Sequence, residues 1–132
     1  MSYRILVVDD SPVSRKIVRR AVQMSGIDSG EILEAGNGKE ALELLGKSWI
    51  DVVLADINMP VMDGLELVSE MAKQDYMKAT PVVIISSEKG EQKVEQMLAM
   101  GVSAYVPKPF RPEQLKQIIG KLLREKKGED HG

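Results

Sequence analysis

A buried strand that ends in an aspartate constrains this chain more than any other stretch of its sequence. The segment Asp51-Val-Val-Leu-Ala-Asp56 holds four apolar residues in a row between two acids. An unbroken apolar run is typical of a parallel strand covered on both faces, where the alternation of a half-exposed strand is lost. Pro60 and the Asp63-Gly64 pair then favour a loop. Asp56 is therefore predicted at the carboxyl end of a strand, the edge where open α/β sheets bind ligands.

The same pattern recurs along the chain. Apolar runs predict four more strands, at about 4–8, 31–35, 82–85 and 103–106. Helical periodicity and capping residues predict a helix from about Pro12 to Ser25, one ending at Gly46, one around Leu65–Ala72, one closed by Gly101 and one opened by Pro112. Strands that alternate with helices predict one doubly wound α/β domain with right-handed crossovers.

The first helix is expected to have one apolar stripe and one basic stripe. The apolar stripe comprises Val13, Ile17, Ala21 and Met24. The basic residues are Arg15, Lys16, Arg19 and Arg20. We interpret the basic cluster as a solvated face rather than as a binding site for a partner.

Composition excludes several classes of function. A formal net charge of −2 predicts no direct binding to nucleic acid. The absence of cysteine excludes disulfides and thiolate metal sites, which fits a reducing compartment. No apolar run is long enough to cross a bilayer, and no secretory segment precedes the first strand. We therefore expect a cytoplasmic monomer without membrane contact.

Three acids are predicted to meet at one edge of the sheet. If the strands at 4–8 and 52–55 are neighbours, Asp9, Asp10 and Asp56 lie across strands about 4.8 Å apart. Two carboxylates about 5 Å apart repel by roughly 3 kcal/mol at an effective dielectric of about 20, so three of them require a cation. Oxygen ligands without His or Cys favour Mg²⁺ or Mn²⁺.

Ser86 and Lys108 come at the ends of the strands at 82–85 and 103–106 and add a hydroxyl and a cation to the same crevice. Together with the acids they suit phosphoryl transfer. This reaction needs a nucleophile, a cation that stabilises the negative charge of the phosphoryl group, and donors to its equatorial oxygens. Each residue alone has an ordinary explanation, such as a helix cap at Asp9 or a solvated turn at Lys108. The joint pattern favours a functional site, because independent caps have no reason to gather on four strand ends.

These residues resemble the receiver domains of two-component response regulators, above all the single-domain, CheY-like type of chemotaxis. The resemblance spans about 3–126 and is carried by Val8-Asp9-Asp10, Ala55-Asp56-Ile57-Asn58-Met59-Pro60, Met62-Asp63-Gly64, Ile85-Ser86-Ser87 and Tyr105-Val106-Pro107-Lys108-Pro109-Phe110. It implies a flavodoxin-like sheet of order 2-1-3-4-5 with five helices. The receiver domain would occupy residues 1–126, and a flexible charged tail would follow at 127–132.

The resemblance also implies a role for each matching residue. Asp56 would accept a phosphoryl group from a sensor histidine kinase or a phosphotransfer protein. Asp9, Asp10, Asp56 and the main-chain carbonyl of Asn58 would hold Mg²⁺. The chain would then catalyse its own phosphorylation and dephosphorylation but no reaction on another substrate, and it would act by binding a downstream protein.

Further family features match the end of the chain. Ser86 would hydrogen-bond the phosphoryl oxygens and Lys108 would pair with them, with a cis Lys108-Pro109 bond. Tyr105 matches a switch aromatic, and the output face would be the helix near 94–100, the strand of Tyr105 and the last helix. Ser86 stands where threonine is commoner, which predicts a looser switch. Asn58 and Glu88 match positions that tune the lifetime of the phosphoryl group.

Two other functions compete with this interpretation. An interaction module that has lost phosphorylation would signal by contacts alone, although the complete acid set argues against it. A phosphatase of the haloacid dehalogenase type also combines Asp, Lys, a hydroxyl and Mg²⁺, but its nucleophile lies in an Asp-x-Asp motif, whereas Asp9 and Asp10 are adjacent. A flavodoxin-like flavin site is weaker still, because no Ser/Thr-Gly phosphate loop follows the first strand.

Overall fold

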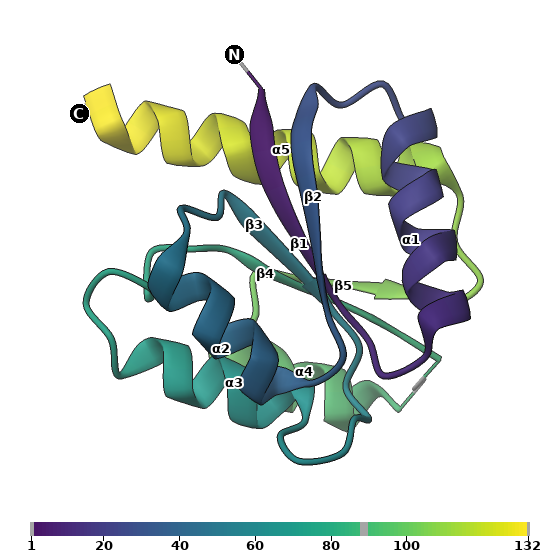
Figure 1. Cartoon of the computed structure of the whole chain (residues 1–132), viewed down its shortest axis with the longest axis vertical. Helices are drawn as coiled ribbons and strands as arrows, with labels where there is room; N and C mark the ends of the chain where they lie inside the picture. Colours follow the sequence, from purple (N-terminus) through teal and green to yellow (C-terminus); the bar gives the residue numbers. More distant parts are fainter. Residues whose placement is uncertain (1, 88–89, 132) are drawn as a thin grey trace.

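The computed structural model describes residues 2–87 and 90–131. Its strands are β1 (Tyr3–Val8), β2 (Ser29–Ala35), β3 (Val52–Ala55), β4 (Val82–Ser86) and β5 (Ala104–Pro107). Its helices are α1 (Pro12–Met24), α2 (Gly38–Lys47), α3 (Gly64–Ala72), α4 (Glu91–Ala99) and α5 (Pro112–His131). The strand pairs are parallel, and the order β2-β1-β3-β4-β5 confirms the predicted doubly wound fold (Figure 1).

Helices cover both faces of the sheet, with α1 and α5 on one face and α2, α3 and α4 on the other (Figure 1). Every residue of β3 and β4 is buried. Successive residues point to opposite faces, so Val53 packs into the core under α2, α3 and α4, whereas Val52 and Leu54 pack under α1 and α5. This burial on both faces explains why the sequence of the inner strands is continuously apolar.

The buried face of α1 differs from the predicted apolar stripe. The helix buries Val18, Ala21 and Val22. Val13, Ile17 and Met24 of the predicted stripe are instead exposed over 57% to 69% of their surface. Two apolar stripes overlap at Ala21, and helical periodicity alone does not choose between them. The prediction was wrong because the packing of α1 against the sheet and α5 decides which stripe faces inward.

The last helix extends beyond the predicted end of the domain. The sequence places that end at Lys126, but α5 continues to His131. The predicted tail is therefore helical up to His131, and its flexibility stays a prediction. Within residues 2–87 and 90–131, no helix is long and apolar enough to cross a membrane.

Candidate functional site

The carboxyl ends of β1 and β3 bring two of the predicted acids together. These strands are neighbours, with Val8 opposite Ala55, so Asp9 and Asp56 follow at adjacent positions. The Asp56 N–H donates to the Val8 carbonyl at 3.0 Å, which continues the pairing one residue past the strand. Strand β2 lies on one side of β1, and β3, β4 and β5 follow on the other side. The direction in which successive strands are added to the sheet therefore reverses at β1. The acids therefore lie at the crevice where doubly wound folds bind ligands.

Lys108 reaches the same crevice from the end of β5. Its Nζ lies 3.5 Å from Asp9 Oδ2 and 3.5 Å from Asp56 Oδ2. The Lys108 N–H donates to the Ser86 carbonyl at 2.9 Å, and the Lys108-Pro109 bond is cis. One ammonium group is thus shared between two carboxylates that come from different strands.

Asp9 is the most buried acid of this group, with 3% of its surface exposed. Burial raises the pKa of the Asp9 carboxyl above its ordinary value, because a charge loses its hydration in the interior. The Ser11 N–H, which donates to Asp9 Oδ1 at 2.9 Å, and the Lys108 ammonium lower the pKa in part, whereas Asp56 and Asp10 raise it further. Ionised Asp9 is therefore incompletely compensated by the chain itself.

The loop after β3 fixes the Asp56 side chain. Asp56 Oδ1 accepts the Ile57 N–H at 2.7 Å, while Oδ2 faces Lys108. The Gly64 N–H donates to the Ile57 carbonyl at 2.8 Å. A methyl group on Gly64 would overlap the Asp56 carbonyl oxygen, so the close return of the chain at the start of α3 requires glycine.

The other predicted site residues lie at or beside this edge. Ser86 is buried at the end of β4, and the Tyr105 hydroxyl donates to the Ser86 carbonyl at 3.2 Å. Asp10 and Asn58 are exposed on the loops that follow β1 and β3. Glu88 lies outside the described residues. The structure therefore brings Asp9, Asp56 and Lys108 together at this edge, and the roles of these residues stay predictions.

The donor set fits a divalent cation of the magnesium type. Within the described parts of the chain, no three His, Cys, Asp or Glu side chains form a ready metal cage. Mg²⁺ does not need one, since it is usually held by one or two carboxylates and keeps several waters. Asp9 and Asp56 supply two carboxylates whose shared ammonium lies 3.5 Å from each. The incomplete compensation of Asp9 also favours an added positive charge.

A groove of about 630 Å³ adjoins the crevice. It lies between α1 and the loop from β5 to α5, and Ile17, Met24 and Phe110 give it an apolar lining. Lys108 and Ser87 also line the groove, and the Lys108 ammonium lies 3.5 Å from Asp9 and from Asp56. The exposed apolar residues of α1 therefore flank the candidate site.

Arg15 was not predicted to belong to the site. Its Nη1 donates to the main-chain carbonyl of Asp9 at 2.6 Å. A carbonyl acceptor leaves no signature in a sequence, and the position of Arg15 within a basic cluster favoured a solvated role. Only the packing of α1 against β1 and β2 reveals this contact.

Together, the fold and the site define a doubly wound domain with an acidic crevice at its switch point. Residues 5–120 match the family described as "Response regulator receiver domain". A chemotaxis protein CheY homolog of Campylobacter jejuni is 37% identical over 127 residues, which cover 96% of each chain. The solved structure of the chemotaxis response regulator CheY4 of Vibrio cholerae has 34% identity and a TM-score of 0.82, over 93% of this chain and all of that one.

A third match comes from a much longer protein. The sensor histidine kinase CheAY of Helicobacter pylori is 33% identical over 124 residues, which cover 92% of this chain but 15% of that protein. The chain belongs to the response regulator receiver domain family of two-component signalling. Members of this CheY-like family are not classical enzymes.

Proposed function

We propose that this chain is a phospho-accepting switch in which Asp56 receives a phosphoryl group from a phosphohistidine. The observation that carries the proposal is the position of Lys108 Nζ, 3.5 Å from a carboxylate oxygen of both Asp9 and Asp56. A nucleophilic carboxylate, a second carboxylate and a cation in one crevice match the requirements of phosphoryl transfer. Family membership supports the same assignment.

In this proposal, each residue of the crevice has a chemical role. Asp56 Oδ2 attacks phosphorus while Oδ1 stays bound to the Ile57 N–H, so the carboxylate is held in one orientation. The bond from Oδ2 to phosphorus forms as the bond from phosphorus to the imidazole nitrogen breaks, and the imidazole leaves with the electron pair. Lys108 and the Ser86 hydroxyl then stabilise the equatorial oxygens.

We assign the divalent cation, Mg²⁺ with Mn²⁺ as a substitute, to Asp9, Asp10, Asp56 and the main-chain carbonyl of Asn58. Bound there, it would neutralise negative charge on the phosphoryl oxygens. Asp9 supports the assignment because its burial leaves its charge incompletely compensated. Asp10 and Asn58 are exposed on the bordering loops, where they can accept a hydrated ion.

The output would come from Ser86 and Tyr105. The Tyr105 hydroxyl donates to the Ser86 main-chain carbonyl at 3.2 Å, so a main-chain shift that carries Ser86 toward the phosphoryl group would weaken this hydrogen bond. A group with a charge near −2 supplies the force for that movement. The proposed result is altered binding of a downstream protein at the face formed by α4, β5 and α5.

The phosphodonor would be a sensor histidine kinase or a phosphotransfer protein, and the compartment would be the cytoplasm. The apolar groove beside Lys108 supports a protein donor, because a small phosphate ester has no use for the apolar surface of Ile17, Met24 and Phe110. Chemotaxis proteins among the relatives support a role in that process.

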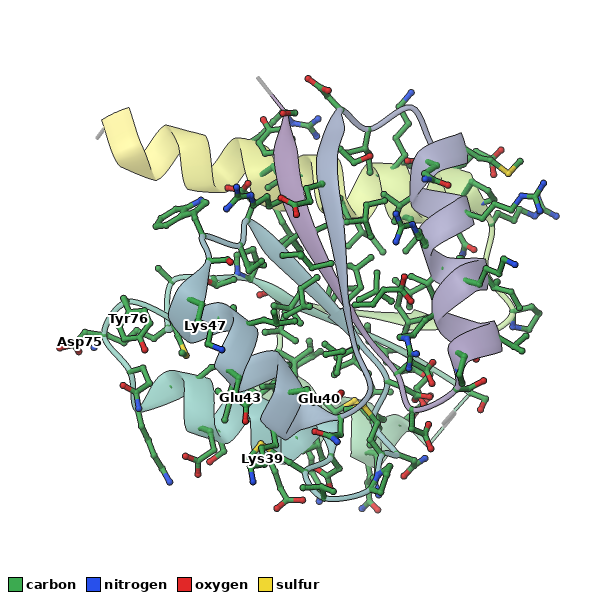
Figure 2. The ribbon with its side chains drawn as sticks, in the orientation of Figure 1. Lys39, Glu40, Glu43, Lys47, Asp75 and Tyr76 are labelled. Carbon is green, nitrogen blue, oxygen red and sulfur yellow. The ribbon has the colours of Figure 1, made fainter. Side chains whose placement is uncertain are left out.

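Incubation with acetyl phosphate and Mg²⁺ tests the proposal. Intact-mass spectrometry is expected to detect one added phosphoryl group on the wild type and none on Asp56→Asn. Asp75→Asn is the matched control, because Asp75 lies on the loop after α3 and its side chain is 97% exposed (Figure 2). An unmodified wild type would contradict the proposal, and turnover of many phosphate esters would favour a phosphatase.

A further inference from the structure

The structure divides the basic cluster of α1 into two parts. Lys16 and Arg20 are exposed, as the sequence predicts. The Arg15 side chain is only 20% exposed and turns toward β1 and β2. Arg15 therefore has a role within the fold that a solvated face does not explain.

Two acceptors, one just after β1 and one on β2, hold the Arg15 guanidinium. Its Nη1 donates to the Asp9 carbonyl at 2.6 Å, and its Nε donates to Glu34 Oε1 at 3.1 Å. Arg19, one helical turn later, donates to the other oxygen of Glu34 at 2.9 Å. Because hydrogen bonds to charged groups are strong and the guanidinium is a rigid fork, Glu34 on β2 fixes the direction from which Arg15 contacts Asp9.

The Asp9 carbonyl belongs to the peptide that joins Asp9 to Asp10. The Asp9 N–H already donates to the Ala35 carbonyl at 3.1 Å, and the Asp9 carboxylate accepts the Ser11 N–H. The contact from Arg15 restrains the main-chain carbonyl of Asp9, and with it the plane of the peptide between Asp9 and Asp10. The orientation of that plane sets the directions in which the carboxylates of Asp9 and Asp10 leave the chain.

The loop from β2 to α2 encloses the contact on a further side. A Cβ atom on Gly36 would lie 3.7 Å from Arg15 Nη1 and 2.9 Å from Glu40 Oε2. The Gly36 N–H donates to the same Glu40 oxygen at 2.6 Å, and Glu40 lies in the first turn of α2 (Figure 2). The Arg15 side chain, which projects from α1, is thus enclosed by β2 and by this loop.

We propose that Arg15 is a positioning residue for the divalent cation, because it holds the peptide between Asp9 and Asp10 in the orientation that presents both carboxylates to the crevice. The inference rests on the proposed function. Charge alone predicts the opposite effect, since a guanidinium near the site repels a cation and its removal would tighten binding. The sign of the change therefore separates positioning from simple electrostatics.

The test is the Mg²⁺ affinity of Arg15→Met, measured by isothermal titration calorimetry on folded protein. The affinity is expected to fall about tenfold, the scale of losses when a contact that orients a metal ligand is removed. Arg19→Met is the matched control, because it removes the same charge and a contact to the same Glu34 carboxylate but leaves the Asp9 carbonyl contact. Its affinity is expected to stay within about twofold of the wild type, since exposed ion pairs contribute little.

Thermal unfolding without Mg²⁺ establishes that both variants are folded. Should Arg15→Met fail to fold, Arg15→Lys replaces it, because lysine keeps the charge but lacks the fork that contacts Asp9 and Glu34 together. Weaker Mg²⁺ binding by this variant supports the inference. Unchanged or tighter binding by the Arg15 variant, or an equal loss in Arg19→Met, would overturn it.

The outcome also separates this inference from the proposed function. A wild type that neither binds Mg²⁺ nor becomes phosphorylated refutes both. A wild type that does both, together with an Arg15 variant of unchanged Mg²⁺ affinity, refutes the positioning role alone.

Discussion

An aspartate flanks the strand β3 at each end, and the two carboxylates differ in the groups that compensate their negative charge. Asp51, before the strand, accepts the Arg4 N–H and the Trp49 Nε1–H, each at 2.9 Å. Asp56, after the strand, accepts the Ile57 N–H, and its other oxygen shares the Lys108 ammonium with Asp9. Asp51 thus joins the amino edge of the sheet to its neighbours, whereas Asp56 lies in a crevice with surplus negative charge. One residue type stabilises the fold at one edge and, in our proposal, performs chemistry at the other.

The largest expected effect comes from removing the shared cation at the carboxyl edge. Lys108→Met should slow phosphorylation by acetyl phosphate about 100-fold, because the developing charge on the phosphoryl oxygens loses a donor. Lys47→Met, at the exposed end of α2, is the control and should react like the wild type (Figure 2). Time-resolved mass spectrometry measures both rates. Equal rates for the two variants would remove Lys108 from the mechanism.

A smaller effect is expected on stability when the buried acid is neutralised. Asp9→Asn should raise the free energy of unfolding without Mg²⁺ at pH 7 by roughly 1 kcal/mol, which corresponds to about 4 °C in Tm. The reason is that burial raises the pKa of Asp9 above its ordinary value of 3.8, so the ionised carboxylate destabilises the native state. Added Mg²⁺ should stabilise the wild type more than the variant.

The pH dependence of this increase in stability tests whether the charge of Asp9 causes it. Between pH 3.8 and the raised pKa of native Asp9, the native state binds more protons than the unfolded state, so its stability falls as pH rises. The advantage of Asp9→Asn should therefore be full at neutral pH and disappear as the pH falls through this window. Denaturant unfolding from pH 7 to pH 4 measures it. A gain that is the same at every pH would indicate a packing effect instead of a charge effect.

An effect of similar size but opposite sign is expected at the amino edge. Asp51→Ala should lower the free energy of unfolding by about 1 kcal/mol, because the Arg4 N–H and the Trp49 indole lose an acceptor that is partly open to solvent. Its phosphorylation by acetyl phosphate should remain at the wild-type rate. Urea unfolding and intact mass measure the two properties. A variant with normal stability but slow phosphorylation would reverse the roles assigned to the two edges.

The position of Trp49 illustrates how far sequence reasoning reached. Trp49 comes just before β3 in the chain, so chain order alone places it at the amino edge of the sheet, where its indole N–H donates to Asp51. The residue is nevertheless 65% exposed. Chain order predicts the edge at which a residue lies, but the exposure of its side chain depends on neighbours that are distant in sequence.

The first helix shows the same limit from another side. Its start at Pro12 after the Ser11 cap was predictable from local chemistry, and the Ser11 side chain does accept the Ser14 N–H. The rotation of the helix about its own axis was not predictable, because two apolar stripes share Ala21 and either could face the sheet. The contacts of Arg15 were not predictable either, since its acceptors are Asp9, just after β1, and Glu34 on β2.

The sequence by itself determined which segments are buried strands, where each strand ends and which polar residue stands at that end. These properties follow from local patterns, because burial on both faces requires a continuous apolar run, and the runs of β1, β3 and β4 stop at Asp9, Asp56 and Ser86. The tertiary structure alone decided that Lys108 lies between Asp9 and Asp56, that α1 turns its second stripe inward and that Arg15 reaches the Asp9 carbonyl. Distances between separate strands and helices depend on how the whole core packs, and no local pattern encodes them.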